Sequence, residues 1–416
     1  MPSICIIGAG TGGLCSARHA VESGFETTVF ELSDRIGGTW VYIEATGIVN
    51  GIDVHSSMYK NLRTNLPKEV MGFPDFEIAE NEMSYVRSDE MLDFFEQYAE
   101  HFKLKQHIRF NSYVVRVVKK NEKWQVLVKD VVTNKIAFHY FDKIIVANGH
   151  YHTPNYIKIP NMERFKGESM HSHDFRTNKI FEGKTVLVIG GGPSGMDLSN
   201  IISRAAKRVI ISHHVTDIGD NIFFENVRQK PDVRELDENG AFFVDGSYEQ
   251  FDIIFYCTGY KYAFPFLSVD SGIYVEDKYV QDLYKQCINI RDPSIALIGL
   301  PFYVCAAQMM DLQARFVMSY YNGKNKLPSP EVMLKDTQDR MNKLWNEGYR
   351  RRQAHMLGHN QAHYYTDLAE TAGIKKIKDV MAKLHDESSK CFNENLLHFR
   401  EDIFKIVDDE TFIKVN

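Results

Sequence analysis

Two glycine-rich turns in this chain have the spacing of a phosphate-binding motif. Both have the form G-x-G-x-x-G, one at residues 8–13 and the other at residues 190–195. Each follows an apolar, β-branched run, at residues 4–7 or 185–189, and precedes a run with helical periodicity. Glycine there permits a tight bend and close approach of the backbone to a phosphate, so that free amides at the helix N-terminus face the anion. The sequence therefore predicts two dinucleotide sites, formed by Gly8, Gly10 and Gly13 and by Gly190, Gly192, Pro193, Ser194 and Gly195.

The residues that end the next strand of each unit indicate which dinucleotide each turn binds. Residues 27–30 end in Glu31, whose carboxylate would accept hydrogen bonds from both hydroxyls of an adenosine ribose. Glu31 therefore predicts an unphosphorylated ribose, as in FAD or NAD. Residues 208–211 end instead in Ser212 and the segment 213–216, without an acid. No carboxylate there repels a ribose 2′-phosphate, which favours NADPH over NADH, although no Arg is present to bind that phosphate.

The chain is organised as one nucleotide unit inserted into another. We expect the first unit, which binds FAD, to comprise residues 1–156 and 291–416, and the second, which binds NADPH, to comprise residues 157–290. The predicted fold class is α/β, with two Rossmann-like dinucleotide-binding domains and a helical C-terminal segment. Ser88 is the expected N-cap of a helix. The further helices and strands are predicted at residues 88–102, 113–118, 123–128, 143–147, 253–257, 295–298 and 306–320.

The composition is that of an ordinary globular protein. The 416 residues are 44% hydrophobic and 25% charged, with a net charge of −6, so we expect no nucleic-acid partner. The chain begins directly with a strand-like run, and no apolar run approaches the roughly 18 residues of a membrane span. These features predict a soluble protein with no membrane partner in a reducing compartment, most simply the cytoplasm. Secretion after removal of a signal peptide is the alternative.

Cysteine and histidine spacing does not favour a metal site. The six cysteines form no C-x-x-C and several lie in apolar runs, so buried reduced thiols are expected. His355, His359 and His363 are spaced by four, which would place them on one face of a helix. Gly358 weakens that helix and no carboxylate completes a catalytic zinc motif, so we predict no metal ion.

Residues 165–175, between the two units, match the pattern F-x-G-x-x-x-H-x-x-x-[FY]. With this pattern the chain resembles the soluble flavin-containing monooxygenases, which are class B flavoprotein monooxygenases. Residues 37–40 resemble the family's G-G-x-W, and residues 64–69 resemble its segment S-N-x-x-K-E. Residues 256–260 resemble its A-T-G-Y turn and residues 311–316 its E-L-Q-A-R-W helix. The resemblance therefore extends over nearly the whole chain.

The resemblance implies that FAD binds at the first turn and NADPH at the second. Asn65 is the candidate catalytic residue, because a neutral amide can hydrogen-bond flavin, nicotinamide or peroxide without transferring a proton. Many relatives have an Arg at the position of Val215. The FAD site would include, besides its glycines and Glu31, the residues Arg35, Gly38, Thr39, Trp40, Thr64, Asn65, Val114 and Gln313. The NADPH site would include, besides its turn, Ser212, His213, His214 and Thr216.

The reaction implied by the resemblance is monooxygenation. NADPH reduces FAD, O₂ adds to form a flavin 4a-hydroperoxide, and one oxygen atom passes to a soft nucleophile. Phe175 stands where Baeyer–Villiger enzymes usually carry Trp, which favours oxygenation of a heteroatom. We expect N-oxidation of a tertiary amine, such as an alkaloid or xenobiotic, with S-oxygenation or Baeyer–Villiger oxidation as the alternative. The partners would be this small molecule and O₂, with homo-oligomers allowed.

Two other classes fit less well, and one stays open. A disulfide reductase needs a redox cysteine pair that the spacing does not offer, and an amine oxidase would need only the first glycine turn. A flavoprotein that binds both cofactors but serves as a scaffold or sensor has the same motifs.

Overall fold

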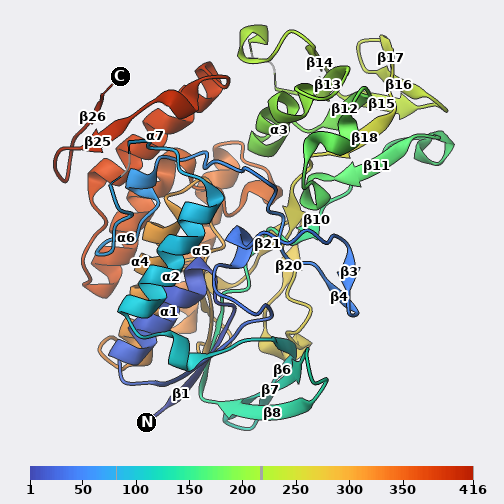
Figure 1. The fold of residues 1–416 in the computed structure, drawn as a ribbon. Helices are drawn as coiled ribbons and strands as arrows, with labels where there is room; N and C mark the ends of the chain where they lie inside the picture. Colours follow the sequence, from blue (N-terminus) through green and yellow to red (C-terminus); the bar gives the residue numbers. More distant parts are fainter. Residues whose placement is uncertain (81, 216–218, 416) are drawn as a thin grey trace.

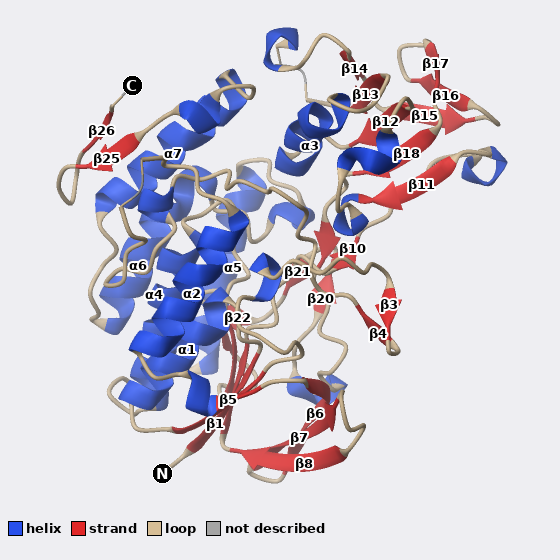
Figure 2. Ribbon diagram, viewed as in Figure 1, coloured by secondary structure: helices blue, strands red, loops and turns tan. Residues whose placement is uncertain are grey.

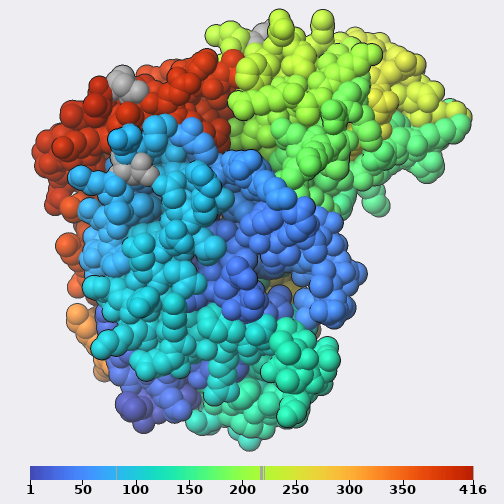
Figure 3. Space-filling view, viewed as in Figure 1, coloured from blue at the N-terminus to red at the C-terminus, as the bar shows by residue number. Residues whose placement is uncertain are grey.

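The computed structural model describes residues 1–80, 82–215 and 219–415. It has a large body and a smaller lobe, which is drawn in green and yellow at the upper right of Figures 1 and 3. The body contains both described ends of the chain, and the lobe is formed by residues from the middle of the sequence. This arrangement is the α/β fold with an inserted second unit that the sequence predicts.

The body is built on a seven-stranded sheet in the order β22-β23-β24-β9-β1-β2-β5. The strands from β24 to β5 are parallel, whereas β22, β23 and β24 pair in antiparallel fashion. The bounds are β1 Ser3–Ile7, β2 Glu26–Phe30, β5 Ile108–Arg109, β9 Lys143–Val146, β22 Leu283–Tyr284, β23 Ile288–Asn289 and β24 Ile295–Leu297. The β-branched run that predicted β1 is buried along its full length, as expected of a parallel strand that is covered on both faces.

The two faces of this sheet are covered by different elements (Figure 2). Ile4 and Ile6 belong to the core that the helices cover, whereas Cys5 and Ile7 belong to the core beneath a three-stranded antiparallel sheet. This alternation is the period of two of a strand. The covering helices are α1 Thr11–Glu22, α2 Ser88–His101, α4 Ala306–Tyr321 and α6 Gln361–Ala372, and the second sheet consists of β6 Ser112–Lys120, β7 Lys123–Asp130 and β8 Ile136–Phe141.

The lobe repeats this arrangement on a five-stranded parallel sheet in the order β11-β18-β12-β13-β14. Helix α3 (Pro193–Ser203) covers one face, and an antiparallel sheet of three short strands covers the other. The bounds are β11 Glu168–His171, β12 Thr185–Ile189, β13 Arg208–Ser212, β14 Val227–Lys230, β15 Val233–Leu236, β16 Gly240–Phe243, β17 Tyr248–Gln250 and β18 Ile253–Tyr256.

The chain passes between body and lobe at one place. Strand β10 (Thr153–Pro154) leads into the lobe, and β19 (Tyr260–Lys261) leads out of it. The two strands pair in antiparallel fashion, with Thr153 opposite Lys261 and Pro154 opposite Tyr260. Both ends of the inserted unit are therefore held at one point.

Two sequence expectations require correction. Strands β22 and β23 belong to the first sheet although they lie within residues 157–290, and Val117 of β6 donates to the Phe266 carbonyl at 2.7 Å. The second unit therefore ends soon after β19, because the short apolar runs that follow pair with the body. Ser88 is the first residue of α2 and not its N-cap. The cap is Arg87, whose backbone N–H donates to the Glu90 carboxylate at 2.8 Å.

The C-terminal region is largely helical, as the sequence predicts, and ends in a hairpin that it does not. Its elements are α5 Pro330–Asn346, α6, α7 Asp379–Glu394, β25 Phe404–Ile406 and β26 Phe412–Lys414. The remaining short strands are β3 Ile48–Val49, β4 Ile52–Asp53, β20 Val275–Glu276 and β21 Tyr279–Val280. In the part of the chain that the structure describes, no helix has the length and apolar character needed to cross a membrane.

Candidate functional site

The first glycine turn connects β1 to α1 and leaves no room for side chains. Gly8 has a φ of +103°, and a Cβ on it would lie 2.6 Å from the Ala147 carbonyl oxygen. A Cβ on Gly13 would lie 1.8 Å from the Gly8 carbonyl oxygen. Helix α1 begins at Thr11, and no side chain of the described residues caps it. The amides of its first turn therefore remain available to an anion.

Glu31 lies at the end of β2, beside this turn. Its Oε2 accepts a hydrogen bond from the Ala9 amide at 2.7 Å. Its Oε1 accepts from the amide and the hydroxyl of Ser33, both at 2.8 Å. The carboxylate is buried, and its Oε2, which accepts one hydrogen bond, can accept another. Glu31 thus holds the glycine turn as well as presenting a carboxylate beside it.

The Gly-Gly-Thr-Trp segment packs against the same turn. Gly38 and Trp40 bound a short 3-10 helix, and a Cβ on Gly38 would lie 3.0 Å from the Gly10 Cα. Gly38 and Gly10 therefore pack against each other where this segment crosses the first turn. Thr39 and Trp40 are half-buried, and Arg35 is exposed and pairs with Asp34 at 2.9 Å.

Asn65 lies in the segment between β4 and α2, with an exposed side chain. Thr64 before it is buried, and its Oγ1 has no hydrogen-bond partner among the described residues. Its amide donates to the Val86 carbonyl at 2.9 Å. Lys68 and Glu69, which follow, form an ion pair at 2.6 Å. The loop therefore combines a fixed backbone with a buried hydroxyl that has a hydrogen bond to give.

Val114 and Gln313 occupy interior positions. Val114 is buried in β6, in the core between the two sheets of the body. Gln313 of α4 is fully buried, and both of its polar atoms have protein partners. Its Oε1 accepts from the Gly299 amide at 2.9 Å, and its Nε2 donates to the Tyr364 hydroxyl at 2.8 Å. Gln313 thus fixes the turn that follows β24.

The second glycine turn connects β12 to α3 with the same geometry. Gly190 has a φ of +116°, and a Cβ on it would lie 2.5 Å from the Cys257 carbonyl oxygen. A Cβ on Gly195 would lie 1.8 Å from the Gly190 carbonyl oxygen. Pro193 is the first residue of α3, and Ser194 is exposed. A Cβ on Gly192 would meet no described atom within 4 Å, so this glycine faces open space.

His213 occupies in the lobe the position that Glu31 occupies in the body. Ile189 pairs with Ser212 as Ile7 pairs with Phe30, so His213 and Glu31 each come one residue after the pair. The ring is buried; its Nδ1 accepts from the Val215 amide at 3.2 Å, and its Nε2 donates to Gln229 Oε1 at 2.9 Å.

The other candidates at this strand end differ in accessibility. Ser212 is buried, and its hydroxyl donates to the Pro231 carbonyl at 2.9 Å. His214 is exposed, 3.5 Å from an Asp232 carboxylate oxygen. Thr216 lies outside the described residues. Only His214 therefore presents an exposed side chain among the described members of this group.

Sequence reasoning missed a cluster of aromatic rings where the body meets the lobe. The rings of His55 and His152 stack with centroids 4.9 Å apart, and Tyr151 contacts Tyr260 edge-on at 5.5 Å. Burial, followed by the neighbouring His152, lowers the pKa of His55 to about 3. Tyr303 has a φ of +56°, which bulky residues rarely adopt.

Two tyrosines of this region are accessible at the surface. Tyr151 and Tyr303 are 47% and 42% exposed, and the surrounding protein raises the pKa of both hydroxyls by desolvation. Their rings are therefore available to a ligand at the edge of packed protein. The sequence did contain a signal, because residues 149–152 directly follow β9, at the strand ends where ligands bind in such sheets.

The three histidines of the C-terminal region do not share a helix face. His355 is buried, where its Nε2 accepts from the Val280 amide at 3.0 Å. His359 is 93% exposed at the side chain, and His363 lies in α6. Among the described residues, no group of His, Cys, Asp or Glu is arranged to hold a metal ion. Tyr364 and Tyr365 beside them are buried in the helical core.

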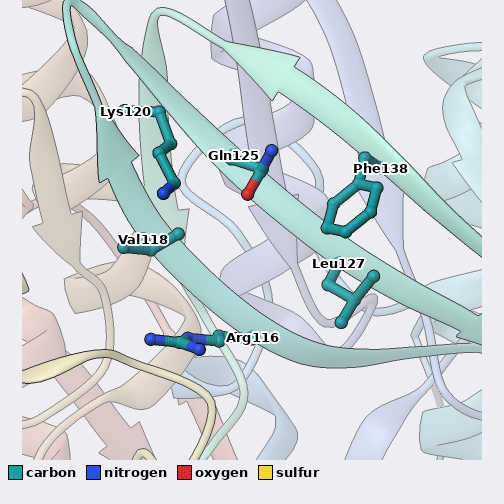
Figure 4. Close-up of a pocket in the computed structure, with 6 residues that line it drawn as sticks. All are labelled: Arg116, Val118, Lys120, Gln125, Leu127 and Phe138. Atoms are coloured by element: carbon teal, nitrogen blue, oxygen red, sulfur yellow. The ribbon is translucent and has the colours of Figure 1, made fainter.

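A pocket on the outer face of β6, β7 and β8 lies away from all of these residues (Figure 4). Its side chains belong to the face of the sheet opposite Trp124 and Val126, which are buried against the body. It is lined by Arg116, Val118, Lys120, Gln125, Leu127 and Phe138. This pocket is therefore separate from the two glycine turns.

Comparisons with known proteins agree on one family. A family model described as flavin-binding monooxygenase-like matches residues 2–218 and 215–388. The chain is 35% identical to senecionine N-oxygenase of Tyria jacobaeae, over 99% of this chain and 91% of that protein. It is 33% identical to flavin-containing monooxygenase FMO GS-OX-like 6 of Arabidopsis thaliana, over 99% and 92%. The solved structure of S-allyl-L-cysteine S-oxygenase from Allium sativum matches with a TM-score of 0.90 at 31% identity, over 96% and 95%.

Proposed function

Because this chain belongs to the flavin-binding monooxygenase-like family, we propose that it oxygenates the nitrogen of a tertiary amine, such as an alkaloid or xenobiotic. The enzyme is an NADPH-dependent flavin-containing monooxygenase with FAD and NADPH as cofactors. It acts on a small molecule together with O₂. The choice of nitrogen as the oxygenated atom rests on the 35% identity to senecionine N-oxygenase over 99% of this chain.

The residues at the two turns fit the two cofactors. Each turn is a cradle in which a Cβ on the third glycine would strike backbone at 1.8 Å, and each opens a helix whose first amides face outward. Bound FAD, once reduced by NADPH, would supply the electrons that activate O₂, with one oxygen atom passing to the substrate and the other leaving as water. The protein's task is to hold both cofactors and exclude water.

We assign FAD to the first turn. Glu31 Oε2 would accept a hydrogen bond from a ribose hydroxyl with the lone pair that Ala9 leaves free. Gly38, Thr39 and Trp40 would cover the cofactor from the side of Gly10. Arg35, which is exposed, would contact FAD at the edge of this site. The buried positions of Val114 and Gln313 support indirect roles, with Gln313 fixing the Gly299 turn.

We assign NADPH to the second turn. Gly192 faces open space, so a pyrophosphate can approach the backbone there. His213 replaces the acid found at Glu31, which removes repulsion of the 2′-phosphate. Exposed His214 is placed to hydrogen-bond that phosphate. The lobe thus offers a binding surface that a cofactor can enter and leave.

Asn65 is the proposed catalytic residue. Its exposed amide can donate to and accept from the reacting groups without changing charge. The unpartnered Thr64 hydroxyl supports a ligand at this loop, because a buried hydroxyl without a partner costs about 1–3 kcal/mol. Cofactor oxygen or nitrogen atoms would satisfy it.

We propose that the substrate binds beside the accessible tyrosines Tyr151, Tyr260 and Tyr303. Aromatic faces bind both the apolar body of an alkaloid and a protonated amine. The imidazole of His55 is uncharged at neutral pH, because burial lowers its pKa to about 3. It would therefore not repel an amine cation.

A second candidate is oxygenation of a thioether sulfur. It is favoured by the solved structure of an S-oxygenase from Allium sativum, which covers 96% of this chain at 31% identity. Both reactions need a lone pair on a soft atom, so the choice depends on the residues around the substrate and not on the glycine turns.

A matched pair of substrates tests the proposal. N,N-dimethylaniline and thioanisole share one ring and differ in the reacting atom, and senecionine represents an alkaloid. NADPH consumption is followed for each, and the product is identified by mass spectrometry. We expect N-oxide from both amines, nearly one per NADPH consumed. Sulfoxide without N-oxide would establish the second candidate, and NADPH consumption without any oxygenated product would contradict both.

A further inference from the structure

Arg400 in the C-terminal region touches both the body and the lobe. It lies in a short 3-10 helix, Phe399–Glu401, between α7 and β25. Its Nη1 and Nη2 donate to the two carboxylate oxygens of Asp197 at 2.8 and 2.7 Å. The side chains are only 19% and 13% exposed. The pair is therefore a bidentate, mostly buried ion pair between segments 203 residues apart.

Asp197 lies on the helix that the second glycine turn opens. It follows Gly195, the third glycine of the turn, by two residues and belongs to the first half of α3. The backbone contact between Gly195 and Gly190 fixes α3 to the turn. A ligand that orders the turn therefore also orders the Asp197 carboxylate.

The same guanidinium holds the loop that carries Asn65. Its Nε donates to the Thr64 carbonyl at 3.0 Å, and its Nη2 donates to the Arg63 carbonyl at 3.4 Å. Arg63 returns a hydrogen bond from its Nη2 to the Arg400 carbonyl at 3.1 Å. The loop and the C-terminal segment thus bond reciprocally, one residue before Asn65.

The chemistry of this contact requires arginine. A planar guanidinium can give two parallel hydrogen bonds to a carboxylate while its Nε serves a third acceptor, which an ammonium group cannot do in one plane. Burial by itself would lower the pKa of Arg400, but Asp197 raises it above its ordinary value. The group stays charged, and its position depends on both α3 and the loop.

We propose that Arg400 is a positioning residue that couples occupation of the second dinucleotide turn to the placement of the Asn65 loop. The inference rests on the proposed assignment of NADPH to that turn and of Asn65 to the reaction. When the cofactor orders α3, Asp197 fixes the guanidinium, and the guanidinium fixes the carbonyls of Arg63 and Thr64. The loop is then ordered when the nicotinamide cofactor is present.

Hydrogen exchange of the FAD-loaded enzyme tests this coupling directly. We expect NADP⁺ to slow amide exchange at residues 190–203 and also at residues 62–67. In Arg400→Ala, NADP⁺ should still protect residues 190–203 but no longer residues 62–67. Lys383→Ala is the matched control, because it removes an exposed ion pair with Glu410 in the same C-terminal region, and it should behave as the wild type.

Three results would overturn the proposal. Protection of residues 62–67 in Arg400→Ala would show that the loop responds to the cofactor without Arg400, and its absence in the wild type would show that the loop does not respond to the cofactor. Absence of protection at residues 190–203 in the wild type would overturn the NADPH assignment itself. If Arg400→Ala does not fold, Asp197→Asn removes the charge at nearly constant volume and should give the same loss of protection.

Kinetics provide a second measurement. Arg400→Ala and Asp197→Ala should each raise the KM for NADPH by about fivefold or more, which is the lower limit of ordinary coupling between sites. Each should also reduce the product formed per NADPH. The double variant should be no worse than either single variant, because both remove one interaction. Additive effects, or a change in thermal stability alone, would contradict coupling through this pair.

Discussion

The two glycine turns have the same backbone geometry but different surroundings. In both, the first glycine amide bonds to the end of the neighbouring strand, at 2.8 Å from Gly8 to Phe30 and at 2.9 Å from Gly190 to Ser212. The first turn is enclosed, because Gly38 packs on Gly10 and the Glu31 carboxylate closes its side. The second faces open space at Gly192. One cradle therefore suits a cofactor that stays, and the other suits a cofactor that exchanges.

The largest effect is expected from replacing the third glycine of each turn. Each replacement should impair the binding of one cofactor and leave the other bound. Gly13→Ala places a Cβ 1.8 Å from backbone, so we expect flavin content, measured by absorbance per protein, to fall about tenfold or more. Gly195→Ala should retain FAD and lose reduction by NADPH. Gly192→Ala is the control for packing, because it should weaken NADPH binding without lowering thermal stability. Equal flavin loss in Gly13→Ala and Gly195→Ala would contradict the assignment of the two cofactors to different turns.

Asn65 lies in the loop that Arg400 joins to helix α3 of the second turn, and its removal should uncouple reduction from oxygenation. Asn65→Ala should keep bound FAD and its reduction by NADPH, while product per NADPH falls by about 10- to 1000-fold, as when one donor to a reacting group is lost. Hydrogen peroxide formation should rise correspondingly. Unchanged coupling in this variant would remove Asn65 from the reaction.

Exchanging the strand-end residue should alter which nicotinamide cofactor is used. His213→Glu introduces at the second turn the carboxylate that Glu31 provides at the first. Repulsion of the 2′-phosphate should shift the ratio of kcat/KM values from NADPH toward NADH by about tenfold, or about 1.4 kcal/mol. His213→Gln keeps a neutral hydrogen-bonding side chain and serves as the control. An unaltered ratio in the glutamate variant would mean that the 2′-phosphate lies elsewhere.

The smallest predicted effect is a pH-dependent contribution of His19 to stability. His19 lies in α1, the helix that follows the first turn. Burial alone would lower the pKa of His19, but hydrogen bonds to Asp311 and Glu22 raise it above its ordinary value. A raised folded-state pKa contributes stability that is complete below the unfolded value of about 6.5 and is lost as pH rises through the folded value. His19→Gln should therefore lower Tm by about 2 °C at pH 6, and by less at pH 9. A difference that grows with pH would contradict this assignment.

The sequence located the elements that depend on local pattern. The apolar runs and glycine spacing predicted β1, α1, β12 and α3, and the helix expected at residues 306–320 is α4. Contacts between distant residues were not predictable in this way. The pairing of β22 with β23 in the first sheet depends on short strands without a periodic signal, and the Arg400 to Asp197 pair joins segments 203 residues apart.

The same distinction between local pattern and distant contacts applies to the residues of the candidate site. Glu31 follows a strand directly after a glycine motif, so its position could be read from order along the chain. The role of Gln313 could not, because its partners Gly299 and Tyr364 lie 14 and 51 residues away in sequence. The tyrosines of the proposed substrate site, Tyr151, Tyr260 and Tyr303, likewise come from three separate segments.

The antiparallel pair of β10 and β19 makes the lobe an exchangeable module. Because Pro154 lies opposite Tyr260, the entry and exit of the lobe are neighbours, and a foreign domain with adjacent termini could be grafted between them. The body would keep its own sheet, since none of its seven strands comes from residues 155–259. Because Arg400 of the body also pairs with Asp197 of the lobe, a grafted domain would need a carboxylate at that position. Chimaeras with and without this carboxylate would separate the choice of electron donor from the ordering of the Asn65 loop.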